Sequence, residues 1–131
     1  MQKSKATLLT STLSALLLLT ATFTAEASPS NKWRLEFSGG AESAGTIVLR
    51  ISPEGGTPIE ATIEVKDGTG ENGVANTVEE SLKAQLPKDG YDVERDDGED
   101  VLIKKDLGAA DFDLEIVSNT VKGVSINPDK E

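Results

Sequence analysis

A period-two alternation of apolar and polar residues runs through most of residues 33–126 and constrains the fold more than any other feature of the sequence. In the clearest run, residues 59–66, every second side chain is apolar: Ile59, Ala61, Ile63 and Val65. Successive side chains of a β-strand point to opposite faces of its sheet, so these segments bury one face and expose the other. The alternation therefore predicts an antiparallel sheet with a single packed face.

One segment departs from this period and predicts a helix. Its apolar residues recur at every fourth position: Val74, Val78, Leu82 and Leu86. This spacing places them on one stripe of a helix of about four turns, which would lie on the apolar face of the sheet. Asn72 or Thr69 is expected to cap the start of this helix, and Pro87 with Gly90 to end it.

Together these patterns predict an α+β domain, an antiparallel β-sheet of about seven strands with one helix packed on it, in the order βββαββββ. The strands are expected at residues 33–37, 47–51, 59–66, 91–94, 101–103, 112–116 and 121–126. Asp97-Gly98 predicts a hairpin turn between the fourth and fifth strands. Gly123 is expected to mark a bulge in the last strand, and residues 127–131 to form a frayed tail.

Residues 1–27 contain the three parts of a secretory signal peptide. Two lysines give a positive start, residues 15–19 are apolar, and Ala25-Glu26-Ala27 has small residues at the two positions that signal peptidase reads. A membrane-spanning helix needs ~20 predominantly apolar residues, whereas residues 6–24 are rich in Ser and Thr. We therefore expect a cleaved signal peptide, a mature single domain over residues 28–131 without a membrane span, and export to the periplasm or the extracellular space.

The composition argues against several kinds of function. The chain has no Cys and no His, which removes disulfides, thiol catalysis, the Ser-His-Asp triad and the commonest metal ligands. Its formal net charge of −10 repels phosphate backbones, so nucleic-acid binding is not expected. We also expect the protein not to be an enzyme. A hydrolase built on paired carboxylates is the alternative, although one Trp and one Tyr offer few platforms for a sugar substrate.

Residues 68–73, Gly-Thr-Gly-Glu-Asn-Gly, match the G-x-G-x-x-G pattern of dinucleotide-binding turns. The strand before such a turn is buried on both faces, and backbone amides after it hold a pyrophosphate. Here the preceding strand alternates with charged residues, and Glu71 would place a negative charge in the phosphate site. We therefore expect these glycines to serve a strand-to-helix turn and expect no cofactor.

The candidate functional residues are acidic side chains around the predicted hairpin turn: Asp92, Glu94, Asp96, Asp97, Glu99 and Asp100. Their spacing does not fit an EF-hand, because counting from Asp92 puts Asp97 at the required glycine and Ile103 at the required glutamate. Three interpretations remain: a solvated hairpin tip, a weak calcium site, and a docking face for a basic protein, whose encounter the opposite charge would accelerate.

These expectations combine into a predicted function. The sequence favours an exported, small, acidic binding or interaction module, such as an inhibitor or an envelope accessory protein, with a basic protein as the partner. Two alternatives stay open: the carboxylate-type hydrolase, and a structural subunit of a surface assembly in which strand edges pair between copies.

Overall fold

The computed structural model describes residues 29–131; the predicted signal peptide lies outside the described residues. The elements confirm the α+β class and the order βββαββββ. Their bounds are β1 (Lys32–Ser38), β2 (Gly45–Pro53), β3 (Ile59–Val65), α1 (Glu71–Gln85), β4 (Tyr91–Asp96), β5 (Asp100–Lys105), β6 (Phe112–Asn119) and β7 (Ser125–Lys130).

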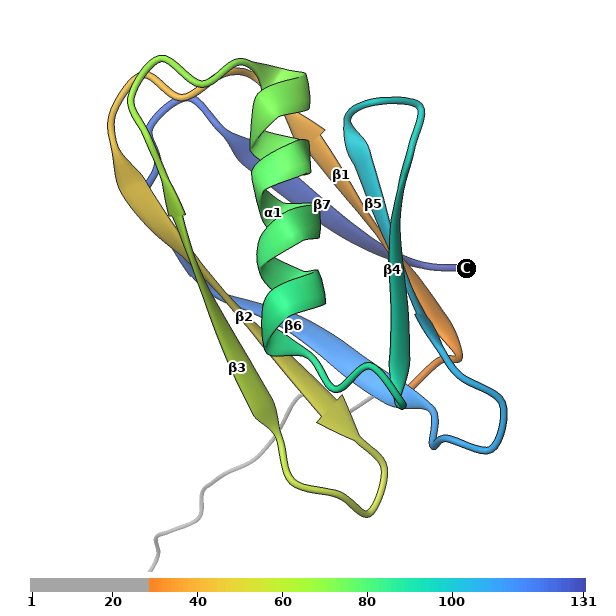
Figure 1. The fold of residues 1–131 in the computed structure, drawn as a ribbon. Helices are drawn as coiled ribbons and strands as arrows, with labels where there is room; N and C mark the ends of the chain where they lie inside the picture. The colour runs from red at the N-terminus through yellow and green to blue at the C-terminus, as the bar shows by residue number, and fades with distance from the viewer. Residues whose placement is uncertain (1–28) are drawn as a thin grey trace, which may run out of the picture.

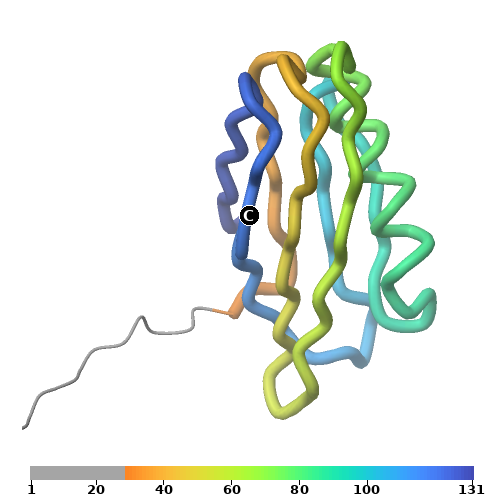
Figure 2. The backbone as a smooth tube through the Cα atoms, turned by 90° about the vertical axis from the view of Figure 1, so that its left-hand side faces the viewer, coloured from red at the N-terminus to blue at the C-terminus, as the bar shows by residue number. Residues whose placement is uncertain are grey.

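The strands form two antiparallel sheets, where the alternation alone had predicted one. A four-stranded sheet has the order β4-β5-β1-β7, and a three-stranded sheet has the order β3-β2-β6. Figures 1 and 2 show the two sheets stacked face to face. A single helix of 15 residues is too small to cover the apolar face of seven strands, so the strands cover one another by stacking as two layers.

The core lies between the sheets. Each central strand contributes side chains that are fully buried, among them Leu35 of β1 and Ile47 and Leu49 of β2. Trp33 is also buried, and its indole N–H donates a hydrogen bond to the carbonyl oxygen of Phe112 at 2.8 Å. No polar or charged side chain is buried within residues 29–131. The interior is therefore apolar, and the polar residues that alternate along the strands face outward.

The helix closes one open side of this sandwich, where α1 packs mainly against β3 and β4 (Figure 1). Three residues of the predicted stripe, Val74, Val78 and Leu82, are buried in the helix, and the fourth, Leu86, is buried as the C-cap residue. The helix thus ends before Pro87, as predicted. The predicted N-caps are wrong, because Gly70 is the N-cap residue and makes no side-chain cap hydrogen bond. The Thr69 hydroxyl donates instead to the carbonyl oxygen of Lys66 at 2.7 Å. None of the helices in the described part of the chain is long and apolar enough to span a membrane.

The C-terminal residues differ from the prediction. Residues 127–130, expected to fray, belong to β7 and pair with β1, as in the pair Glu36↔Asn127. Gly123 lies in the preceding turn with φ +86°, and a Cβ on it would lie 2.5 Å from the Gly40 carbonyl oxygen. The register instead shifts between β2 and β6, where Val117 is the extra residue. The last strand, expected at residues 121–126, is thus observed at Ser125–Lys130. Local pattern misplaced it because its partner, β1, lies at the other end of the described chain.

Candidate functional site

The β4–β5 hairpin carries the predicted acidic cluster. Val93 of β4 points into the core, so the neighbouring side chains of Asp92, Glu94 and Asp96 point outward. Asp100 of β5 pairs with Asp96 across the hairpin. The turn itself is formed by Asp97 and Gly98, with φ of 51° and 81°, as the Asp-Gly pair predicted. Most of the predicted residues therefore lie on the outer face of the four-stranded sheet, while Asp97 and Glu99 form its rim.

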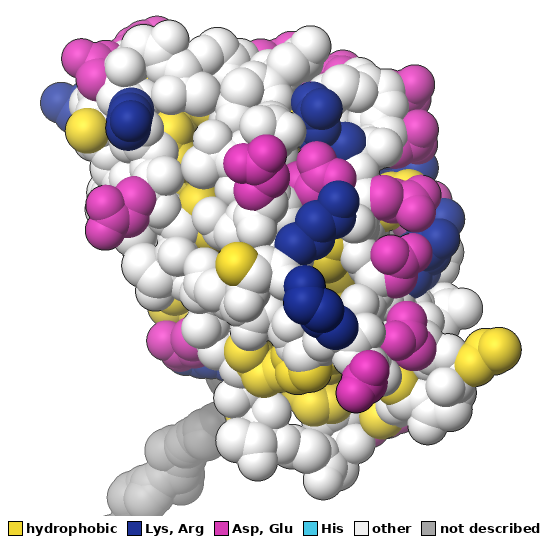
Figure 3. Space-filling model, viewed as in Figure 1, with side chains coloured by type: hydrophobic (Ala, Val, Ile, Leu, Met, Phe, Trp, Pro, Cys, Tyr) yellow, Lys and Arg dark blue, Asp and Glu magenta, His cyan; other side chains and the backbone are white. Residues whose placement is uncertain are grey.

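Two further strands extend this surface, which we call the acidic face. On it, carboxylates outnumber cations: Glu36, Asp92, Glu94, Asp96, Asp100, Asp129 and Glu131 surround Lys32, Arg34 and Lys104. In Figure 3 acidic side chains gather along the side of the molecule formed by β4. The contributions of β1 and β7 were missed at the sequence level, since residues far apart in the chain become neighbours only through sheet pairing. The only local signal for these residues was their position in the strand, which directs their side chains outward.

Arg34 lies at the centre of the acidic face and contacts three carboxylates. Its Nη1 atom is 2.7 Å from Asp100 Oδ2 and 3.2 Å from Asp96 Oδ2, and its Nε atom is 3.2 Å from Glu131 Oε2. These hydrogen bonds, the one to Glu131 first, raise the pKa of Arg34 above its ordinary value. The hydrogen bond from Arg34 in turn lowers the pKa of Glu131. Arg34 thus joins β5, the end of β4 and the residue after β7.

Lys104 holds the other end of the hairpin. Its Nζ atom lies 3.4 Å from Glu94 Oε2 and 3.6 Å from Asp92 Oδ2. The hydrogen bond and charge of Glu94 raise the pKa of Lys104. Asp92, Glu94, Asp96 and Asp100 therefore each face a cation of the protein. In residues 29–131 no three acidic side chains are grouped so as to hold a metal ion, and the geometry offers no support for the calcium interpretation.

An apolar residue lies beneath these ion pairs. Leu102 of β5 is only 5% exposed, although its position in the strand directs it outward, away from the core. Its cross-strand neighbours are Arg34 on β1 and Glu94 on β4. The aliphatic stems of such long charged side chains cover apolar surface while their charged groups stay in water. The acidic face is therefore a packed layer, with charges held in place over a leucine.

The glycine-rich turn has a structural role. Gly68 adopts φ +86° between β3 and α1, a conformation that glycine reaches without strain. The Glu71 carboxylate accepts a hydrogen bond from the backbone N–H of Gly39 at 2.8 Å. At the helix N-terminus this carboxylate also supplies the negative charge that the helix dipole favours. The position that a phosphate would take in a dinucleotide-binding turn thus has an anionic side chain of the protein beside it.

Comparison with known proteins adds no family to this description. No protein-family model matches the chain, and no curated protein matches its sequence.

Proposed function

We propose that the protein is an exported, non-catalytic binding module that presents its acidic face to a basic partner protein. The observation that carries this proposal is the gathering of carboxylates from separate strands around Arg34. Complementary charge increases the rate of encounter and fixes orientation, and a surface already held by a β-sheet needs little reorganisation on binding. An inhibitor and an envelope accessory protein both fit a module of this kind.

The geometry favours binding over the hydrolase alternative. Glycoside hydrolysis needs two carboxyl groups on either side of the scissile bond, one of which keeps its proton. The paired acids of the acidic face lie on the surface of a sheet and share the cations Arg34 and Lys104. Such cations stabilise the ionised form of a carboxyl group. They support a fixed negative surface better than a proton donor.

Two of the four strand edges, those of β3 and β7, also argue against an assembly built by edge pairing. On β3, the Gln85 side chain accepts from the Thr62 N–H at 3.1 Å and donates to the Thr62 carbonyl at 2.9 Å. On β7, Pro128 pairs with Leu35 and has no N–H to offer a further strand. Prolines and occupied backbone groups at sheet edges discourage pairing between copies. We therefore favour a module that binds through a sheet face.

The test compares two variants of equal charge on opposite faces. One carries Asp92→Asn, Glu94→Gln and Asp129→Asn on the acidic face. The other carries Glu60→Gln, Glu64→Gln and Asp113→Asn on the outer face of the three-stranded sheet. Binding of each to cytochrome c, a cationic probe protein, is measured by calorimetry at low and at physiological ionic strength.

We expect the acidic-face variant to bind the probe about fivefold more weakly, since three exposed charge contacts of modest strength are lost. The second variant should retain most of its affinity, and added salt should weaken binding of the unmodified chain. An equal loss in both variants would mean that the probe reads only net charge, and the proposal for this face would then be wrong.

A further inference from the structure

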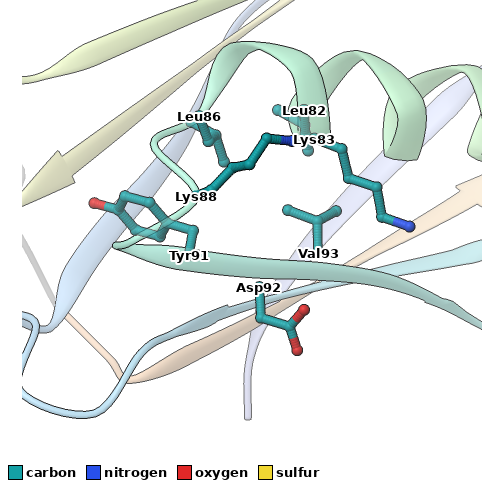
Figure 4. A pocket seen from close by; sticks show the side chains of 7 residues that line it. All are labelled: Leu82, Lys83, Leu86, Lys88, Tyr91, Asp92 and Val93. Atoms are coloured by element: carbon teal, nitrogen blue, oxygen red, sulfur yellow. The ribbon is translucent and has the colours of Figure 1, made fainter.

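A concave site lies between the C-terminal half of α1 and β4. It is a groove of about 240 Å³. Figure 4 shows Leu82, Leu86 and Val93 gathered between the helix and the strand, while Asp92 points to the opposite side of β4. The three apolar residues are at most 5% exposed. The floor of the groove is thus apolar and formed by side chains that the core already holds in place.

Two lysines stand at the mouth of this groove. Lys83 extends from the helix over Val93, and Lys88 extends back from the segment after the helix (Figure 4). The Lys83 ammonium is 2.9 Å from Glu79, whereas Lys88 has no ion-pair or hydrogen-bond partner within residues 29–131. In a chain with a formal net charge of −10, a groove lined by two cations and one acid, Asp92, above an apolar floor is the reverse of the general surface. It is complementary to an anion that carries an apolar tail.

The backbone of β4 adds a polar group to the groove. The Asp106 N–H donates to the Gly90 carbonyl at 3.0 Å, so the residues of β4 that share its parity, Asp92 and Glu94, make the ladder to β5. The N–H and C=O groups of Val93 therefore point away from β5, at the free edge of β4.

Contacts on either side of Val93 limit the length of β4 that an occupant can reach. At one end the Tyr91 N–H donates to the Pro87 carbonyl at 3.2 Å. At the other end Arg95 forms an ion pair with Glu79 at 3.1 Å. The interval from residue 91 to residue 95 is about 13 Å in a strand, too short for a partner strand to run through. Benzene fits a cavity of ~150 Å³, and drug-sized ligands occupy ~300–1,000 Å³, so the groove suits a compound of about ten non-hydrogen atoms.

We infer that this groove binds a small carboxylate with an apolar tail. The tail lies against the exposed parts of Leu86 and Val93, with Leu82 packed behind them, and the carboxylate lies between the ammonium groups of Lys83 and Lys88. The site shares only Asp92 with the acidic face, and the inference does not depend on the function proposed for that face.

The experiment is a titration of the ¹⁵N-labelled chain with octanoate, followed by NMR. We expect saturable shifts of the Val93 and Leu86 amides with a Kd of roughly millimolar, the affinity that a ligand of this size can reach. Heptylammonium, which has the same alkyl tail and the opposite charge, should not produce them. The double variant Lys83→Gln/Lys88→Gln should weaken octanoate binding about tenfold, since both charge-assisted contacts are lost.

The matched control is Lys66→Gln/Lys122→Gln, which removes the same charge at exposed positions outside the groove and should leave the octanoate Kd unchanged. Three results would each overturn the inference: no saturable shift at Val93, equal binding of heptylammonium, or an equal loss of affinity in the control variant. Loss of cytochrome c binding by the acidic-face variant has no bearing on this outcome.

Discussion

The outer faces of the two sheets have the same arrangement of charged residues, but these residues are buried to different extents. Each has one arginine on its central strand, Arg34 on β1 and Arg50 on β2, held by carboxylates from both neighbouring strands or their ends. Arg50 contacts Glu60 at 2.7 Å and Glu115 at 3.0 Å, and its side chain is 36% exposed. Arg34 contacts three carboxylates and is 19% exposed.

The difference comes from what surrounds each arginine. The four-stranded sheet continues past β1 to β7, so that Glu131 reaches Arg34, and it places Leu102 beneath the charges. On the three-stranded sheet the corresponding apolar residue, Val48, is only half-buried. Ion pairs gain strength as water is excluded from them. The same arrangement of an arginine between carboxylates is therefore well shielded from water only where an extra strand and a buried apolar residue adjoin it.

The largest expected effect is on the apolar residues below the charges. Leu102→Ala should destabilise the fold by ~2 kcal/mol, the low end for a buried leucine because the site opens to solvent. That corresponds to a fall of about 10 °C in Tm for a domain of this size. Val48→Ala on the other face should cost well under half as much. Thermal unfolding followed by circular dichroism compares the two variants. Equal losses in Tm would contradict the difference in burial between the two faces.

The arginines themselves should differ in the same sense by a smaller amount. Methionine keeps an apolar stem and removes the charge, so Arg34→Met and Arg50→Met form a matched pair. We expect Arg34→Met to lower Tm by about 5 °C, the effect of ~1 kcal/mol from a charge network, and Arg50→Met to lower it less. The difference in Tm between the two variants should be smaller in 1 M salt. A larger loss for Arg50→Met would reverse the ranking of the two faces.

The smallest expected effect is on the stability of the fold at acidic pH. Because Arg34 lowers the folded-state pKa of Glu131 below its ordinary value of 4.5, the contribution of Glu131 is complete above about pH 4.5 and is lost as the pH falls through the lower, folded-state pKa. In Arg34→Met the pKa of Glu131 should return toward its ordinary value, and Tm should fall less steeply between about pH 5 and pH 3.

Carbon-detected NMR titration of the glutamate side chains measures this directly. Glu79 is the internal control, because Lys83 is the first cause of its lowered pKa and lies away from Arg34. The pKa of Glu79 should therefore be the same in both proteins. An unchanged pKa of Glu131 in the variant would show that Arg34 does not set it.

Much of the fold could be predicted from local pattern. The third strand, expected at residues 59–66, is observed at Ile59–Val65, and the helix, expected at 74–86, is observed at Glu71–Gln85. These elements are readable because the period of their apolar residues is set by backbone geometry within each segment. The Asp97-Gly98 turn was readable because few residue pairs adopt positive φ at both positions.

Part of the candidate site was out of reach of the same reasoning. The acids of β4 and β5 are close in sequence, so their cluster was visible, but Arg34, Asp129 and Glu131 join it only through pairing of β1 with β5 and β7. The Gln85 contact that occupies the edge of β3 likewise depends on how the helix lies across the sandwich. None of these contacts has a signature within a short window of sequence.

The amino-acid sequence by itself determined six of the seven strand segments, the helix, and the core-facing side of those strands, since these follow from the local alternation of apolar and polar residues. Only the tertiary structure decided that the strands divide into two sheets, that the C-terminal residues form β7, and that the carboxylates meet around Arg34. The physical reason is that an apolar sheet face must be shielded from water, but its residues do not specify which helix or strand shields it. That choice depends on the free energy of packing the whole chain.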